Sequence, residues 1–218
     1  LSDHVGLVGD DGKTHHGVLS VPMLMSIPNL TLLAPRDTRQ IRQAVRATLK
    51  LDGPCVVQYP KEGIEPYAQN VTGEPFTVGK WQTLIPGGQD AVILAYGRMT
   101  QNAIQASELL VQRGLSVGVI DCCSLKPLDM DCLRALFERR AKIVTIEEGE
   151  MIGGFGSEIA RVCVEENADA PVQIIGLENR FITHGSVPEL LRECGLMPEQ
   201  LANRIEEIAG DKESSHVG

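Results

Sequence analysis

A regular alternation of apolar runs and helical patterns between residues 90 and 210 constrains the fold of this chain more than any other feature. The apolar runs are rich in Val and Ile, and each is flanked by polar residues or glycine. This pattern is typical of buried strands. Between the runs, apolar residues recur every three or four positions, which is typical of helices with one buried face. Strands that are apolar throughout indicate a parallel sheet covered by helices on both faces. We therefore predict an α/β fold with strands at 90–97, 115–123, 142–149 and 171–177 and helices at 100–113, 128–140, 156–167, 187–194 and 198–209.

The same alternation occurs once before, nearer the N-terminus. The run "NLTLLAP" (29–35) predicts a buried strand, and "PCVVQYP" (54–60) predicts a second one. Asp37 heads the helix between them and has the spacing of a capping box with Gln40. A strand, a helix and a strand in this order predict a parallel pair with a right-handed crossover. The residues expected on the buried face of the helix are Ile41, Ala44, Val45 and Leu49.

Residues 61–89 interrupt the pattern and are rich in Gly, Pro and polar residues. Such a composition is typical of a linker, and a few isolated apolar residues favour a short hairpin at 76–85. We place a domain boundary here. The expected domains are residues 1–75 and residues 76–218.

Charge and composition exclude several classes of protein. The formal net charge of −9 disfavours nucleic acid and anionic membranes as partners, because neither is attracted to an acidic surface. The longest apolar run, at 91–96, is far shorter than the roughly 20 residues that span a bilayer. The six cysteines include no Cys-x-x-Cys pair, so we expect free thiols in a cytoplasmic protein. The chain begins with Leu rather than Met, inside what we interpret as the end of a strand.

The stretch "GDDGKTHHG" (9–17) is the first candidate for chemistry. Its glycines allow a tight loop, and a histidine there can donate or accept a proton near neutral pH. If the stretch is extended, His15 and His16 point in opposite directions and only one of them faces a given pocket. The alternative is a surface loop whose histidines have no role. A zinc site is disfavoured, because no further His or Cys lies at ligand spacing nearby.

Two other stretches lie where parallel strands end. "EEGEMIGGFGSEIA" (147–160) joins a strand to a helix, and its backbone N–H groups either bind an anion or form only a tight turn. Glu147 and Glu148 are adjacent there and need not face one another as a catalytic pair. Lys61 follows the strand 54–60, where ligands gather in such sheets, and is either a phosphate contact or a solvated lysine.

Together these stretches resemble the 1-deoxy-D-xylulose-5-phosphate synthase family of the transketolase superfamily. The resemblance runs from residue 3 to about residue 205, with the segments in the order found in that family. The segments are "GLVGDDGKTHHG", "SIPNLTLLAPRD", "DGPCVVQYPKEG", "DCCSLKPLD", "TIEEGEMIGGFGSEI" and "FITHGSVPELLRECGL".

The resemblance implies an activity and an organisation. The family uses thiamine diphosphate and Mg²⁺ to condense pyruvate with glyceraldehyde 3-phosphate, releasing CO2 and forming 1-deoxyxylulose 5-phosphate for isoprenoid precursors and thiamine. This chain resembles the C-terminal half of the pyrimidine-binding domain followed by the whole parallel-sheet C-terminal domain. The motif that holds Mg²⁺ and diphosphate and the glutamate that acts on the aminopyrimidine belong to the part that would precede residue 1. We therefore expect no cofactor or metal bound by this chain alone, a missing N-terminal half or N-terminal subunit as partner, and a homodimer of the complete enzyme.

The resemblance also implies site residues. His15 is expected to be catalytic, moving protons at the carbonyl oxygens of the intermediates, and Asp11 faces the substrate. Lys61 and His4 lie where the family usually has arginines that contact substrate. Gln58 replaces a third arginine. Because these changes remove fixed positive charge and planar paired donors, they weaken the expectation of a phosphorylated acceptor.

Two alternatives to part of such a synthase remain open. The chain could be a separate subunit of a split transketolase-like enzyme. It could also be a non-catalytic module retained for assembly or ligand sensing.

Overall fold

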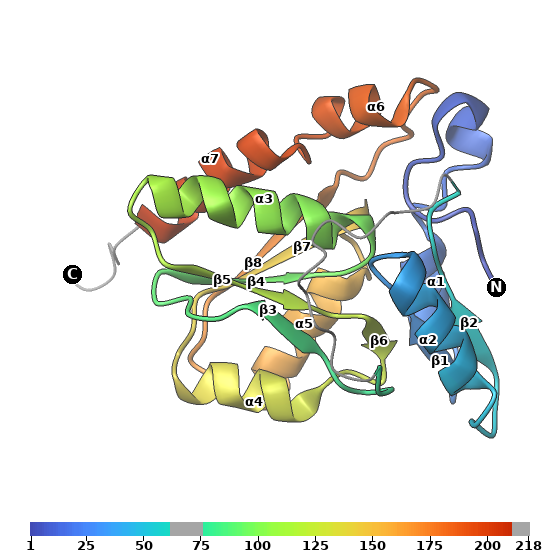
Figure 1. Ribbon diagram of the computed structural model, residues 1–218, viewed down its shortest axis with the longest axis horizontal. Helices are drawn as coiled ribbons and strands as arrows, with labels where there is room; N and C mark the ends of the chain where they lie inside the picture. Colours follow the sequence, from blue (N-terminus) through green and yellow to red (C-terminus); the bar gives the residue numbers. More distant parts are fainter. Residues whose placement is uncertain (62–75, 211–218) are drawn as a thin grey trace.

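The computed structural model describes residues 1–61 and 76–210, which form two β-sheets flanked by helices (Figure 1). The larger sheet has the strand order β3-β5-β4-β7-β8. Its strands are β3 (Gln82–Ile85), β4 (Ala91–Ala95), β5 (Val117–Asp121), β7 (Ile143–Glu150) and β8 (Val172–Leu177). The four strands predicted from the apolar runs are present and parallel to one another, which confirms the α/β class.

Helices cover both faces of this sheet. On one face lie α3 (Arg98–Gln112), α6 (Val187–Glu193) and α7 (Pro198–Gly210), and on the other lie α4 (Met130–Glu138) and α5 (Phe155–Glu165) (Figure 1). The central strand β4 alternates between the two cores. Ile93 packs among the residues of α3 and α7, whereas Leu94 packs among those of α4 and α5. Every residue of β4 is therefore buried, as its unbroken apolar run predicts.

The smaller sheet has the order β2-β1-β6, formed by β1 (Thr31–Leu33), β2 (Cys55–Val57) and β6 (Ser124–Lys126). The parallel pair β1–β2 and the intervening helix α2 (Thr38–Thr48) confirm the predicted strand-helix-strand unit. Asp37 caps this helix by accepting a hydrogen bond from the Gln40 backbone N–H at 2.8 Å. Asp129 caps α4 in the same way.

Several local predictions are wrong. Residues 76–85 do not form a hairpin, because β3 pairs with β5 instead. This pairing is antiparallel, so the larger sheet has one antiparallel strand at its edge. Leu49 is 82% exposed, because α2 ends at Thr48 and turns Leu49 out of the buried face. The sequence patterns also missed three short elements: β6, the helix α1 (Ser20–Met25) and the 3₁₀ turn η1 (Gly9–Thr14).

The two sheets share a buried polar network. Arg36, just after β1, forms an ion pair with Asp121 at the end of β5. Gln40 Nε2 donates to the same carboxylate at 2.7 Å, and its own side-chain oxygen accepts the Arg36 backbone N–H. All three side chains are buried, so the network and the β1–β6 pairing fix the N-terminal part, residues 1–61, against the C-terminal part, residues 76–210. The predicted boundary between 75 and 76 borders residues 62–75, which lie outside the described residues.

Neither a membrane span nor a disulfide is found in the part of the chain that the structure describes. No helix within residues 1–61 and 76–210 is long and apolar enough to cross a membrane. The six cysteines are free, and Cys122, Cys123 and Cys163 are buried as small core residues.

Candidate functional site

The histidine loop, residues 7–16, is a closed structure at the N-terminal end of the chain. Its ends meet where the Gly17 backbone N–H donates to the carbonyl of Gly6 at 2.8 Å. A side chain at Gly17 would collide with the carbonyl oxygen of His4, so this close approach requires glycine. Most of the loop is the 3₁₀ turn η1. The stretch therefore does not have the extended backbone for which opposite directions of His15 and His16 were predicted.

The loop brings together the residues that the sequence singled out. Lys61 Nζ donates to Asp11 Oδ2 at 2.8 Å, although 50 positions separate the two residues. The His4 and His15 rings are 5.9 Å apart between centroids. His15 is exposed, and Thr14 Oγ1 lies 3.0 Å from its Nδ1. One proton-transfer group, one carboxylate and one fixed cation therefore share one accessible site.

Electrostatics support this grouping. A hydrogen bond from Lys61 is the main cause that lowers the pKa of Asp11, and the nearby charges of His15 and His4 act in the same direction. The pKa of Asp3 is also lowered, chiefly by its hydrogen bond with His4. Both carboxylates are ionised at neutral pH, which leaves the imidazoles facing negative groups.

His16 has a different environment from His15. Its Nδ1 accepts a hydrogen bond from the Val8 backbone N–H at 3.1 Å, so a neutral ring carries its proton on Nε2. That nitrogen lies 3.0 Å from the carbonyl oxygen of Thr183 in the C-terminal part. The two histidine rings thus lie in different surroundings, although the stretch is a turn and not the extended strand on which the expectation depended.

In the glycine-rich turn after β7, the N–H groups at the start of α5 bind a carboxylate of the chain itself. The Glu147 carboxylate accepts hydrogen bonds from the backbone N–H groups of Phe155 (3.0 Å) and Gly156 (2.9 Å), the first residues of α5. Glu147 is fully buried, and this burial raises its pKa to about 7. Of the two alternatives, the structure favours the tight turn, with an anion supplied from within the chain.

Glu148 faces away from Glu147 and toward the histidine loop. Its Oε1 accepts the Leu7 backbone N–H at 2.8 Å and a hydrogen bond from Arg98 at 3.1 Å. No role for Glu148 was apparent from the sequence. It lies near the end of β7, inside the predicted strand 142–149, and nothing in that position indicated a partner 141 residues away.

Gln58 is the described residue near the site with the least satisfied side chain. It is 1% exposed, and neither its amide nitrogen nor its amide oxygen has a hydrogen-bond partner. It follows β2 directly, three residues before Lys61. A buried amide without a partner costs roughly 1–3 kcal/mol.

Metal ligands are not gathered in the residues the structure describes. Residues 1–61 and 76–210 contain no group of three or more His, Cys, Asp or Glu side chains that could hold a metal ion.

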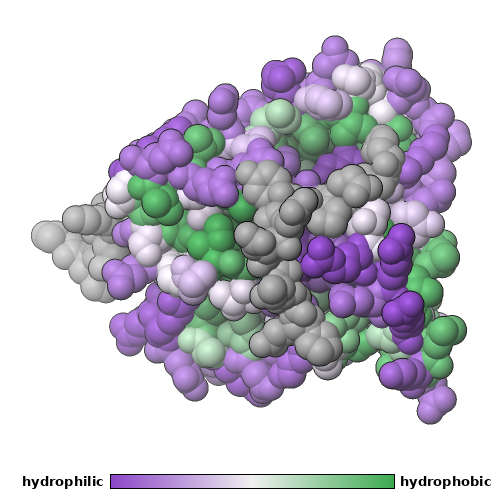
Figure 2. All heavy atoms as spheres, in the orientation of Figure 1, coloured by the Kyte–Doolittle hydropathy of each residue, from purple (hydrophilic) through white to green (hydrophobic). Residues whose placement is uncertain are grey.

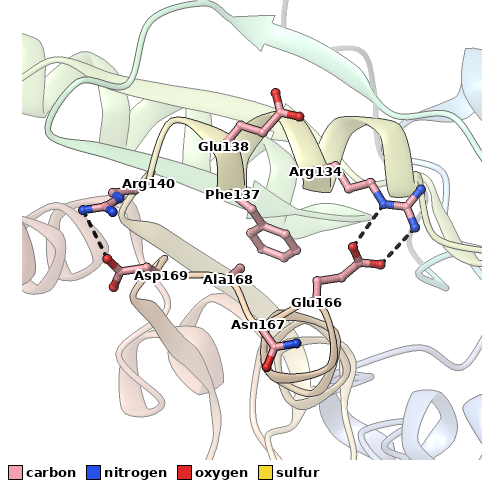
Figure 3. Close-up of a pocket in the computed structure, with 8 residues that line it drawn as sticks. All are labelled: Arg134, Phe137, Glu138, Arg140, Glu166, Asn167, Ala168 and Asp169. Atoms are coloured by element: carbon pink, nitrogen blue, oxygen red, sulfur yellow. Dashed lines mark hydrogen bonds and ion pairs between the residues drawn. The ribbon is translucent and has the colours of Figure 1, made fainter.

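Other hollows lie elsewhere on the surface. One of about 420 Å³ lies between the ends of α4 and α5, where Arg134 pairs with Glu166 and Arg140 pairs with Asp169 (Figure 3). This hollow lies at the opposite end of β7 from the histidine loop. A smaller depression of about 190 Å³ lies behind the loop and is lined in part by Lys13, His16, Leu19 and Phe181.

Two family models match the chain. The model described as "Transketolase, pyrimidine binding domain" matches residues 1–65, and the one described as "Transketolase, C-terminal domain" matches residues 79–201.

Curated relatives of the chain include synthases. The chain is 38% identical over 203 residues to 1-deoxy-D-xylulose-5-phosphate synthase of Thermus thermophilus, covering 93% of this chain and 32% of the relative. It is 36% identical over 218 residues to the Bacillus velezensis synthase, covering 99% of this chain and 34% of the relative. The chain thus spans about a third of the length of the curated relatives it matches.

Solved structures share the fold. A protein titled "Split gene transketolase, inactive beta4 tetramer" superposes with a TM-score of 0.81 at 27% identity, covering 97% of this chain and 66% of that one. Transketolase of Pichia stipitis superposes with a TM-score of 0.74 at 18% identity, covering 95% of this chain and 29% of that one, which is a likeness of fold alone.

Proposed function

The chain belongs to the transketolase family, and we propose that it is the C-terminal portion of a thiamine-diphosphate-dependent 1-deoxy-D-xylulose-5-phosphate synthase. The reaction condenses pyruvate with glyceraldehyde 3-phosphate and releases CO2. The observation that carries the proposal is the convergence of His4, Asp11, His15 and Lys61 at one site on the part that matches the pyrimidine-binding domain.

The roles of these residues follow from their chemistry. The exposed imidazole of His15 donates or accepts a proton at a substrate carbonyl or hydroxyl oxygen. Asp11 holds Lys61 by an ion pair, which keeps the ammonium at the mouth of the site. Lys61 and His4 then attract the anionic end of the substrate. When bound, thiamine diphosphate supplies a carbanion that adds to carbonyl carbons.

The cofactor and its Mg²⁺ are held by residues outside this chain in our proposal. The chain spans only about a third of the curated relatives, and its described residues include no cluster of three or more side chains that could hold a metal ion. Titration calorimetry with thiamine diphosphate and Mg²⁺ tests this directly. We expect no binding tighter than millimolar by the 218 residues alone; micromolar binding would contradict the proposal.

The partner is either an upstream segment of the same protein or a separate N-terminal subunit, and the complete enzyme is a homodimer. The similarity to a solved split gene transketolase supports a separate subunit, and the similarity to curated relatives about three times as long supports a single chain. The intact mass of the purified native protein distinguishes the two. A mass near 23.7 kDa supports a separate subunit, whereas a mass about three times larger supports a single chain.

An exposed apolar face supports the need for a partner. Leu19 is 48% exposed and Met23, one turn later on α1, is 67% exposed. Phe181 shares a depression with Leu19, and Gly153 approaches Pro22 of α1. Figure 2 shows that hydrophobic residues also reach the surface at the right-hand edge, over the end of the molecule that carries β1 and β2. Nucleic acid and membranes are not proposed as partners, given the acidic charge.

A further inference from the structure

The histidine loop is held from outside by a buried ion pair of the C-terminal part. Glu148, at the end of β7, accepts the Leu7 backbone N–H at 2.8 Å. The same oxygen accepts a hydrogen bond from Arg98, the first residue of α3, at 3.1 Å. The two side chains are only 6% and 12% exposed. A bond from a backbone N–H to a buried, oriented carboxylate is stronger than one between neutral groups.

The backbone of Gly6 lies directly against this carboxylate. Gly6 has a φ of +65°, which side chains other than glycine rarely adopt, and a Cβ there would lie 2.5 Å from the Glu148 Cδ. The Gly6–Gly17 contact closes the histidine loop at this same point. Glu148 therefore holds the backbone at the base of the loop. A small displacement of this backbone would also move the residues at the tip of the loop.

A second contact holds the far side of the loop. His16 Nε2 lies 3.0 Å from the carbonyl oxygen of Thr183, and a Cβ on Gly12 would lie 3.1 Å from the Cβ of His184. The backbone N–H of Gly185 points to the carbonyl of Gly9 at 3.5 Å. In Figure 1 the blue loop near the N-terminus lies beside the orange segment that leads into α6.

We propose that Glu148 and Arg98, with the segment 183–185, are positioning residues that set the geometry of the histidine loop and so bring Asp11 and His15 to Lys61 and His4. Neither Glu148 nor Arg98 is a catalytic residue in this proposal. Their effect on catalysis rests on the proposed function, but their effect on the loop does not.

The test uses the 218-residue chain itself, without cofactor. Hydrogen exchange in residues 7–17 and the pKa of Asp11, followed by carboxyl NMR, are measured in Glu148→Ala and Glu148→Gln. In Glu148→Ala we expect exchange in the loop to rise at least 10-fold, and the pKa of Asp11 to rise toward its ordinary value as Lys61 moves away. Glu148→Gln keeps an oxygen that accepts the Leu7 N–H, so it should restore most of the protection.

The matched control is Glu166→Ala, which removes an Arg–Glu pair at the opposite end of β7 (Figure 3). It should leave both readouts of the loop unchanged. If loop exchange and the Asp11 pKa are also unchanged in folded Glu148→Ala, the proposal is wrong. If Glu148→Ala does not fold, Arg98→Met decides. A loosened loop in that folded variant supports the proposal, and an unchanged loop overturns it.

A separate measurement connects the loop to catalysis. In the assembled enzyme, Glu148→Gln should lower kcat/KM less than Glu148→Ala, whose loss we expect to be about 10- to 100-fold because small misplacements of catalytic groups slow reactions by this order. An assembly with no synthase activity would contradict the proposed function but leave the loop measurements valid.

Discussion

Lys61 Nζ and Asp11 Oδ2 form a 2.8 Å hydrogen bond that ties the end of the second strand to the histidine loop. The pair is solvent-exposed, with 50% of the lysine side chain and 38% of the aspartate side chain accessible. Exposed ion pairs contribute little to stability. We therefore interpret this pair as one that places a fixed cation beside His15.

Lys61→Ala should raise the pKa of Asp11, since the hydrogen bond from Lys61 is the main cause of its lowered value. A carboxyl pKa that is lowered in the folded state stabilises the fold above the unfolded pKa, and this contribution disappears as the pH falls through the folded value. The variant should therefore show a weaker loss of stability on acidification. Carboxyl NMR titration measures the pKa, and Lys13→Ala, on the same loop, is the control.

Lys61→Arg should lower the KM of the complete enzyme for glyceraldehyde 3-phosphate. A guanidinium pairs with two phosphate oxygens at once, whereas an ammonium is a point charge. The measurement is kcat/KM for the phosphorylated aldehyde against plain glyceraldehyde. We expect weak discrimination in the wild type. A strong preference for the phosphorylated aldehyde that survives Lys61→Ala would show that other residues hold the phosphate.

His15→Ala should lower turnover of the complete enzyme by about 10²-fold or more, the scale of lost acid–base catalysis. His16→Ala should instead lower stability by about 1–3 kcal/mol, because the buried Val8 N–H loses its acceptor. Steady-state kinetics and denaturant unfolding of both variants separate the two effects. A large loss of turnover in His16→Ala together with a loss of stability alone in His15→Ala would contradict this assignment.

Glu147→Gln should remove a pH dependence of stability. Burial raises the pKa of Glu147 to about 7, well above that of an unfolded glutamate, so the folded state favours the protonated form. Its stabilising contribution is complete below about pH 4.5 and is lost as the pH rises toward 7, a change of about 3 kcal/mol. Urea unfolding at pH 5 and pH 8 measures this loss, which the variant should not show. Tyr96→Phe, which removes a 3.5 Å contact with the same carboxylate, should keep most of it.

Asp121→Ala should destabilise the chain by up to about 3 kcal/mol, because the buried Arg36 loses this carboxylate and keeps the 3.4 Å pair with Asp37. Since the pair joins the two parts of the chain, hydrogen exchange should rise most in β1 and β6. Asp169→Ala, which removes an exposed pair with Arg140, should change stability by less than about 0.5 kcal/mol. Equal losses in the two variants would exclude a special role for the buried network.

The local sequence determined which elements form. The Val- and Ile-rich runs became the parallel strands β4, β5, β7 and β8, and Asp37 caps the helix it heads. These features depend on residues within a few positions of one another. Periodicity, caps and breakers therefore predicted them. His15 and Lys61 became candidates through their positions in a glycine-bearing loop and after a predicted strand. Their roles came from the family resemblance and stay predictions.

Tertiary structure alone decided what surrounds the site. Three contacts join residues 85 to 141 positions apart. They are the pairing of β6 with β1, the ion pair of Arg36 with Asp121, and the hydrogen bond from the Leu7 N–H to Glu148. A three-residue strand or a single glutamate has no periodicity to detect. Its partner is chosen by which faces the folded sheets and helices present to one another, and that choice exists only once the apolar cores have packed.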